Sequence, residues 1–239
     1  MKIKSKLFTD YVKKASLNGE FLIINMDFTE DGLRSAVKNP GDIVMTMTSL
    51  DKSAFKEYKS IGEIFVKSTP TFLKYLKSFN DEITIEKVEE FTIRLSDEKR
   101  EIFVILASES ICGDIVIKQD APVVPTTAKI FFDSGFIKRT IDDVNLLKIS
   151  QIILKKTEKE FFFEVGEKTE SDFFVNKVDF DPIRSKGVGE VTIGQTFVSL
   201  FNALDTVVEF NIGQNLPLVA KEVEGPLSFT CFIAPIAYK

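Results

Sequence analysis

The sequence predicts an α+β protein with two similar domains, each a sheet with two helices. Three observations lead to this prediction: many short runs of β-forming residues, a few amphipathic helical segments, and the same order of these elements in both halves of the chain. The 239 residues, 44% of them hydrophobic, are enough to bury one large core or two smaller ones.

The predicted strands are short runs rich in Ile, Val, Phe and Thr, and turn-forming residues separate them. In the first half these runs cover residues 20–27, 42–48, 82–87, 91–95 and 101–107. In the second half they cover residues 129–132, 150–155, 160–165, 172–178, 190–193, 207–212, 216–223 and 227–233. The outer strands of the resulting sheets must either be protected from pairing with other chains or pair between subunits.

The predicted helices are amphipathic segments at residues 9–17, 70–79, 134–147 and 195–204. The second is the clearest. Pro70 suits a first helical turn, and Phe72, Leu76 and Phe79 lie on one apolar stripe. In the third, Ser134 can cap the first turn.

The order strand, helix, strands, helix, strands occurs twice along the chain. We therefore expect an N-terminal domain at residues 1–116 and a C-terminal domain at residues 128–239. Between them, residues 117–127 contain Pro122 and Pro125 and show no clear periodicity. This composition predicts an extended interdomain connector.

Histidine is absent, which removes histidine general bases, histidine metal ligands and the common nucleophile triads. Cys112 and Cys231 lack metal-type spacing and are expected to be reduced thiols. An enzyme that uses other side chains stays open, because Asp179 and Asp181 form a pair that could hold a divalent metal. A loop role for this pair is the stronger expectation, since such sites need further oxygen ligands. We expect no catalytic residue, metal or cofactor.

The net charge of −5 argues against a uniformly basic surface but allows a local basic stripe. No apolar run approaches the ~20 residues that span a membrane. The basic N-terminus is not followed by an apolar signal core. We therefore expect a cytoplasmic protein without membrane association.

Three local patterns carry a family resemblance. The first is Asn25-Met-Asp-Phe-Thr-Glu-Asp-Gly-Leu-Arg34, followed by residues 38–45. The second is Phe55-Lys-Glu-Tyr58. The third joins residues 215–220 to residues 227–236, which end in Phe232-Ile-Ala-Pro-Ile236. In this order they resemble the early hairpin, the Phe-x-x-Tyr and the terminal Tyr-Leu-Ala-Pro of DNA sliding clamps of the proliferating cell nuclear antigen family, archaeal type.

The resemblance implies a pseudo-sixfold ring of three two-domain subunits, which encircles duplex DNA without reading its sequence. Such a ring, associated with the nucleoid, tethers DNA polymerase, flap endonuclease and ligase for replication and repair, and a clamp loader places it on DNA. The ring is a homotrimer or a heterotrimer with paralogues. We expect strand pairing between subunits at residues 113–118 and 172–178, with interface residues Ile115, Ile117, Phe173 and Val175.

The resemblance also implies that helices line the hole and that their basic side chains meet phosphates through weak contacts. The candidate DNA-facing residues are Lys13, Lys14, Lys74, Lys77, Lys138 and Arg139. Any one of them, taken singly, is better explained as a solvated lysine or arginine. The group is more informative, because three of the four predicted helices place basic residues off their apolar faces. Residues 195–204 contain no Lys or Arg, so this helix adds little to a basic lining.

Partners of such clamps insert a short peptide with a glutamine and aromatic anchors into a pocket beside the connector. By position, the pocket residues are Ile43, Val123, Val124, Pro217, Phe232, Pro235 and Ala237. The sequence departs from the family here. Lys38 replaces an apolar residue, Asp42 a basic one, Phe232 a tyrosine, and Ala237 a larger side chain. These departures leave open a specialised subunit of a heterotrimer that serves one partner or a damage response.

Overall fold

The computed structural model describes residues 1–166 and 172–236, and the chain divides into two compact units. Unit 1 comprises Met1–Gly41, Met45–Asp120 and Val223–Phe229. Unit 2 comprises Asp42–Val44, Ala121–Glu222 and Thr230–Lys239. The expected connector at residues 117–127 is therefore divided, because its first residues lie with unit 1 and those from Ala121 onward with unit 2.

Unit 1 contains two antiparallel sheets. The five-stranded sheet has the order β5-β1-β7-β8-β9, and the other strands follow the order β4-β3-β2-β6. The elements are β1 (Lys2–Lys4), α1 (Ser5–Ala15), β2 (Ile24–Thr29), β3 (Gly32–Lys38), β4 (Val44–Asp51), η1 (Lys52–Ala54), β5 (Phe55–Glu57), β6 (Gly62–Val66), α2 (Thr69–Leu76), β7 (Glu82–Glu89), β8 (Thr92–Ser96), β9 (Glu101–Ile105), α3 (Glu109–Cys112) and η2 (Gly113–Ile115).

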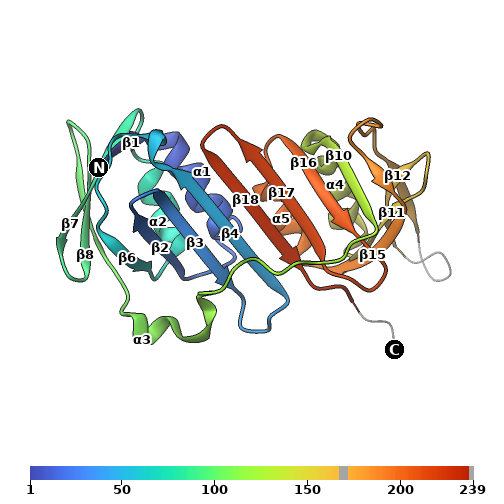
Figure 1. The fold of residues 1–239 in the computed structure, drawn as a ribbon, viewed down its shortest axis with the longest axis horizontal. Coiled ribbons are helices and arrows are strands. Elements are labelled where there is room, and N and C mark those ends of the chain that lie inside the picture. Colours follow the sequence, from blue (N-terminus) through green and yellow to red (C-terminus); the bar gives the residue numbers. More distant parts are fainter. Residues whose placement is uncertain (167–171, 237–239) are drawn as a thin grey trace. The chain divides into compact units, whose positions relative to one another are not determined.

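Both long helices of unit 1 cover one face of β2, β3 and β4 (Figure 1). They bury the apolar stripes that the periodicity predicts, and the rings of Phe8 on α1 and Phe72 on α2 meet edge to face at 6.3 Å. The Thr46 hydroxyl on β4 donates a hydrogen bond to the carbonyl of Ala15, at the end of α1. The helices are thus fixed to the sheet by packing and by a buried polar contact.

Unit 2 repeats this plan with the strand orders β13-β12-β11-β15 and β14-β10-β16-β17-β18, although the end of β17 and the start of β18 fall in the segment Val223–Phe229 of unit 1. Figure 1 shows α4 and α5 on one face of its strands. The elements are β10 (Ala128–Asp133), η3 (Ser134–Phe136), α4 (Ile137–Leu147), β11 (Gln151–Lys156), β12 (Phe161–Val165), β13 (Phe174–Lys177), β14 (Lys186–Gly187), β15 (Gly189–Gly194), α5 (Phe197–Ala203), β16 (Val207–Ile212), β17 (Leu218–Glu224) and β18 (Leu227–Ile233).

The core of unit 2 is a cluster of phenylalanine rings. Phe132 on β10 lies 5.3 Å from Phe161, 6.1 Å from Phe163 and 4.9 Å from Phe210, measured between ring centroids. Phe201 of α5 completes the cluster at 5.6 Å from Phe163. Tilted and edge-to-face pairs of this kind each add about 0.5–1.5 kcal/mol beyond the burial of their area.

The expected helices and most expected strands are present, with ends shifted by a few residues. The strand expected at residues 113–118 is wrong. That segment begins with η2, directly after the end of α3, and then Val116 bridges Val37 while the Ile117 amide donates to the Ala36 carbonyl. These residues bond to the backbone of β3 in their own unit and do not form a separate strand. Among the described residues, no helix is long and apolar enough to cross a membrane.

Candidate functional site

The helices of unit 1 carry an excess of positive charge. α1 holds Lys6, Lys13 and Lys14 against Asp10, and α2 holds Lys74. Lys74 is exposed, as is Lys77 at the C-cap of α2, and both lie off the stripe that buries Leu73 and Leu76. Lys6 forms an ion pair with Asp10 at 2.9 Å.

Lys14 departs from the expected DNA-facing role. Only 4% of the residue is exposed, and its Nζ lies 5.7 Å from the centroid of the Phe229 ring. Its aliphatic stem packs inside unit 1 and its ammonium group meets an aromatic face. Lys13, one position earlier, is half-buried on another side of the helix. Lys14 is therefore a core residue, and the prediction for it is corrected.

The helices of unit 2 carry no such excess. On α4, exposed Lys138 and Arg139 in the first turn are followed by Asp142 and Asp143, so the helix is neutral. Asp143 accepts a hydrogen bond of 2.6 Å from the Asn176 amide on β13. α5 has no charged side chain within Phe197–Ala203. The basic residues predicted for this unit are therefore accessible to solvent, but the aspartates on the same helix offset their charge.

A groove of about 360 Å³ runs beside the connector in unit 2. The connector supplies one wall, and the faces of β16, β17 and β18 supply the floor. The lining residues are Ala121, Pro122, Val123, Val124, Thr126, Asn211, Val219, Lys221, Thr230 and Phe232. Val123 is 95% exposed, as expected for an apolar side chain that a connector presents to solvent.

Three of the predicted pocket residues, Val123, Val124 and Phe232, meet in this groove. Ile43 and Pro235 lie at the end of β18, where the Ala234 amide donates to the Ile43 carbonyl at 2.8 Å and Pro235 bridges Ile193 of β15. Pro217 is half-buried in the turn before β17 and does not line the groove. Ala237 lies outside the described residues.

The sequence analysis missed the polar part of the groove floor. Lys221 lies 4.0 Å from Glu209, which also pairs with Lys129 at 3.0 Å. Burial alone would raise the pKa of Glu209, but hydrogen bonds from Asn211 and Lys129 outweigh it and lower the pKa. The carboxylate is thus ionised between two lysines. Alternation along β16 and β17 is the signal that could have found these residues, because it places Asn211 and Val219 side by side.

Two outer strands of the described sheets carry large exposed apolar side chains. β9 ends the five-stranded sheet of unit 1, and β13 ends one sheet of unit 2. Phe103 and Ile105 on β9 are 57% and 54% exposed, and Val175 on β13 is 54% exposed. Below β9, Phe103 and Ile105 join Phe72 and Tyr75 of α2 around a cavity of about 220 Å³. Large apolar side chains on an unpaired strand mark an association surface.

These edges revise the predicted interface. Val175 lies on β13 and Phe173 directly precedes that strand. Ile115 instead packs against the cluster of Phe65, Ala107 and Cys112, and the Ile117 amide donates to the Ala36 carbonyl. β9 is an outer strand of unit 1, and it exposes Phe103 and Ile105. The sequence carries no signal for this exposure, because residues 102–105 form a continuous apolar run and only the structure shows which of them face solvent.

The aspartate pair has a structural role. The Asp181 carboxylate accepts hydrogen bonds from the amides of Ile183 at 2.9 Å and Arg184 at 3.1 Å, which closes a turn. Within the described residues, no group of three His, Cys, Asp or Glu side chains is placed to hold a metal ion.

No family model matches the sequence, and no curated protein matches it. Solved structures do. The proliferating cell nuclear antigen of A. fulgidus, in a structure with the C-terminal region of FEN-1 bound, matches with a TM-score of 0.79 and 20% identity over 100% of this chain and 98% of that one. The PCNA2–PCNA3 complex from Sulfolobus tokodaii matches with a TM-score of 0.76 and 19% identity over 98% and 99%. The proliferating cellular nuclear antigen of Entamoeba histolytica matches with a TM-score of 0.80 and 14% identity over 99% of this chain and 98% of that one.

The chain has the proliferating cell nuclear antigen fold. This confirms the fold class and the resemblance at the level of architecture, over the whole described chain. The Phe55-Lys-Glu-Tyr58 pattern has a physical role in this fold. The two rings meet at 4.8 Å, and the Tyr58 hydroxyl lies 2.8 Å from the Thr29 carbonyl and 2.7 Å from the Gly32 carbonyl, at the β2–β3 turn.

Proposed function

We propose that this chain is a subunit of a DNA sliding clamp, a ring that encircles duplex DNA and tethers replication and repair enzymes to it. The observation that carries the proposal is the match of both units, at TM-scores of 0.76 to 0.80 and 98–100% of this chain, to proteins of that fold. On this proposal the chain is not an enzyme, and it works in the cytoplasm on nucleoid DNA.

The proposed mechanism is topological. A ring that slides must not grip DNA tightly, and exposed lysines on helices make weak phosphate contacts that salt screens. Lys13, Lys74 and Lys77 supply these contacts in unit 1. Lys138 and Arg139 supply fewer in unit 2, because carboxylates offset them.

The decisive experiment is loading onto nicked circular DNA by a clamp loader. The retained protein should escape when the circle is cut once, because a ring leaves through a free end. A control circle with both ends blocked after cutting should retain the protein. Retention on cut DNA with free ends would rule out sliding.

The groove beside the connector is the proposed site for partner peptides, including those of polymerase, flap endonuclease, ligase and clamp loader. An extended peptide with an apolar anchor fits between Val124 and Phe232. Fluorescence anisotropy with a labelled partner peptide should show about tenfold or more weaker binding for Phe232→Ala, in the range of interface hot spots. Ile183→Ala, at a 94% exposed apolar residue outside the groove, is the matched control and should bind normally.

A second candidate is a specialised subunit that acts only within a heterotrimer. The observation that favours it is the groove floor, where Lys221 and Asn211 place polar groups beside Val219 and Phe232. Light scattering separates the two. A chain that assembles alone supports the general clamp, whereas a monomer that assembles only with paralogues supports the specialised subunit.

A further inference from the structure

The groove beside the connector carries positive charge as well as apolar surface. Val123, Val124, Val219 and Phe232 supply apolar lining, and Lys221 projects from the floor with 47% of its side chain exposed. Among the described residues that line the groove, Lys221 is the one ionisable side chain. A segment bound here would therefore meet an ammonium group next to its apolar contacts, with no carboxylate in the lining to offset it.

The carboxylate that Lys221 faces from the neighbouring strand is Glu209, and its Oε1 atom is already occupied. The Asn211 side-chain amide donates to Oε1 at 2.8 Å, and the Lys129 ammonium lies 3.0 Å from the same atom. Lys221 lies 4.0 Å from it, beyond hydrogen-bond distance. A carboxylate oxygen offers about two lone-pair sites, and Asn211 and Lys129 use both. The donors of Lys221 therefore remain available to a ligand.

Lys221 belongs to a group of cations on the outer face of this sheet. Lys129 of β10 lies opposite Lys186 of β14 and opposite Asn211 of β16, and Glu209 of β16 lies opposite Lys221 of β17. The Lys186 side chain is exposed, whereas only 16% of the Glu209 side chain is exposed. Solvent therefore meets the ammonium groups of this face and little of the carboxylate between them.

Two further carboxylates of unit 2 close turns next to this face. Asp133, at the end of β10 away from the groove, accepts a hydrogen bond from the Gly135 amide at 2.7 Å. Asp181 accepts hydrogen bonds from the amides of Ile183 and Arg184. The groove and its surroundings are thus positive, although the net charge of the whole chain is −5.

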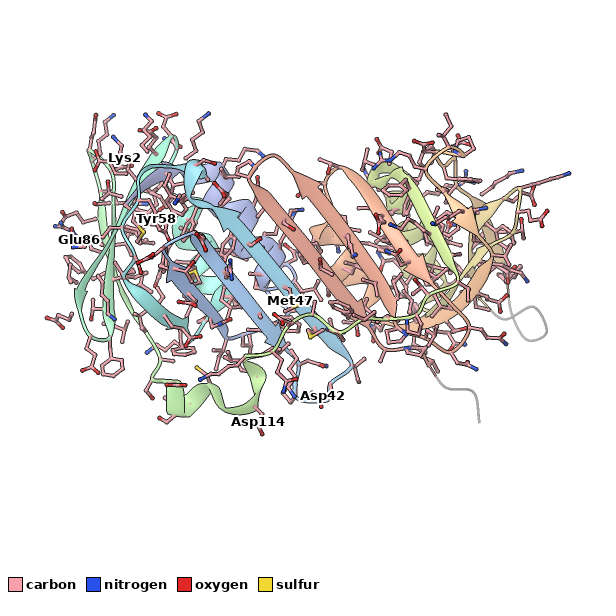
Figure 2. The ribbon with its side chains drawn as sticks, viewed as in Figure 1. Lys2, Asp42, Met47, Tyr58, Glu86 and Asp114 are labelled. Carbon is pink, nitrogen blue, oxygen red and sulfur yellow. The ribbon has the colours of Figure 1, made fainter. Side chains whose placement is uncertain are left out.

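The occupant that fits this combination is an extended peptide. The connector crosses β18 and β17 (Figure 2), and its valines with Phe232 form a cleft of about 360 Å³, within the range of sites that hold a few anchoring side chains. A nucleic acid would have to lay its row of phosphates across these valines. A peptide can instead place an apolar side chain among them and a carboxylate at Lys221.

Strand geometry sets the spacing between the two contacts. Val219 and Lys221 are two residues apart on β17, and both side chains face the groove. Two residues of a strand span about 6.7 Å, and an extended peptide covers the same length in two residues of its own. An apolar anchor over Val219 therefore brings the second residue before or after it within reach of Lys221.

We infer that the groove selects partner segments that carry an Asp or Glu about two residues from an apolar anchor, and that Lys221 recognises this carboxylate. This inference rests on the proposed peptide site and names the chemistry of its partner. Lys129 and Lys186 extend the attraction to further acidic residues of the segment, through contacts that salt screens. Phe232 then supplies affinity, and Lys221 supplies specificity.

Matched peptides test the charge preference. Both probes are fluorescein-labelled peptides with a glutamine and aromatic anchors, and they differ at the second residue on either side of the anchors. The acidic probe has Asp or Glu there, and the neutral probe has Asn or Gln. In anisotropy titrations the parent chain should bind the acidic probe about fivefold more tightly, the upper range for an exposed ion pair. Added salt should reduce this difference. Equal affinities at low salt, or tighter binding of the neutral probe, would overturn the inference.

Lys221→Gln tests the residue. The variant should bind the acidic probe as weakly as the neutral one, while its affinity for the neutral probe stays that of the parent. Lys155→Gln is the matched control, because Lys155 lies on β11 in the other sheet of unit 2, is 41% exposed and pairs with Glu190 at 3.1 Å. The control should keep the fivefold preference. Both variants should melt like the parent chain, since both side chains are exposed. A folded Lys221→Gln chain that keeps the full preference would refute the role of Lys221.

A charge reversal separates direct contact from a general basic field. Lys221→Glu should bind the acidic probe more weakly than the neutral one. A third probe with Lys at the same positions should bind Lys221→Glu more tightly than it binds the parent. Absence of this crossover would overturn direct recognition. A short labelled duplex should bind the parent and Lys221→Gln alike, and weaker duplex binding by the variant would assign Lys221 to DNA instead.

The outcomes separate this inference from the clamp proposal. A chain that passes the linearisation assay but shows no preference between the probes would refute the inference and leave the clamp intact. A chain with the preference that fails the linearisation assay would support the inference and refute sliding. Binding of neither probe, or binding that Phe232→Ala leaves unchanged, would refute both the peptide site and this inference, while the linearisation assay still reports on the ring.

Discussion

Unit 1 and unit 2 each place two helices on one face of a sheet, yet the exposed sides of those helices differ in charge. Outside the buried Lys14, the helices of unit 1 carry three lysines against one aspartate, and those of unit 2 carry two basic residues against two aspartates. The fold requires only the apolar stripe, so the solvent side is free to vary. In the proposed ring, attraction to DNA therefore comes mainly from one unit of each subunit.

The largest expected effect is on the free energy of unfolding, and it compares the cores of the two units. Phe132→Ala in unit 2 should cost about 4–5 kcal/mol of unfolding free energy, because three further rings pack on it, and Phe72→Ala in unit 1 about 3 kcal/mol. Urea denaturation measures both. Equal costs would show that the aromatic cluster adds nothing beyond buried area.

The next effect concerns DNA. Lys74→Ala with Lys77→Ala should lower the slope of log affinity against log salt by about 1.8, since each phosphate contact contributes about 0.9. Lys138→Ala with Arg139→Ala should lower it by less than about 0.9, because Asp142 already repels phosphate. Anisotropy titrations of a labelled duplex measure both slopes. Equal reductions of the slope in the two double variants would mean that both units contribute equally to phosphate contacts.

A smaller effect distinguishes neighbours on α1. Lys13→Ala should reduce the same slope by up to about 0.9, the value of one phosphate contact. Lys14→Met should leave it unchanged, because Lys14 is 4% exposed and faces Phe229. A lower slope for a folded Lys14→Met variant would show that Lys14 does contact DNA.

The smallest effect is alkaline destabilisation of unit 1. Burial, and then the Asp27 carboxylate, raise the pKa of Tyr58 from 10.0 to about 12. The fold favours the protonated phenol, so its contribution is complete below pH 10 and is lost as pH rises through about 12. The melting temperature of Tyr58→Phe should therefore fall less than that of the parent over this interval. Tyr75→Phe is the control and should follow the parent.

Local patterns were enough to predict much of this molecule. The stripe of Phe72 and Leu76 behind Pro70 gave α2, because helix periodicity and a first-turn proline are properties of the segment itself. β3 was missed. Its Arg34, Ser35 and Ala36 have little β-forming tendency, and the strand depends on β2 and β4 on either side.

The site was harder to predict because its residues depend on contacts distant in sequence. Lys14 is buried against Phe229, and no feature of the α1 segment indicates that aromatic ring. The groove floor joins Asn211 to Phe232 across neighbouring strands, so only the strand order reveals it. At residues 113–118 a strand was predicted that the structure does not have. Apolar side chains of this segment pack against Phe65 and Ala107 and do not mark a strand.

β9 of unit 1 and β13 of unit 2 are two different outer strands, so in the proposed ring a joint between them would add copies head to tail. In a closed ring the last joint forms within one molecule, at an effective concentration in the millimolar range for short links. Each joint can then be individually weak while the assembly persists after dilution. A loader that parts a single joint leaves the others holding the open chain together, and the gap can reseal as soon as the loader departs.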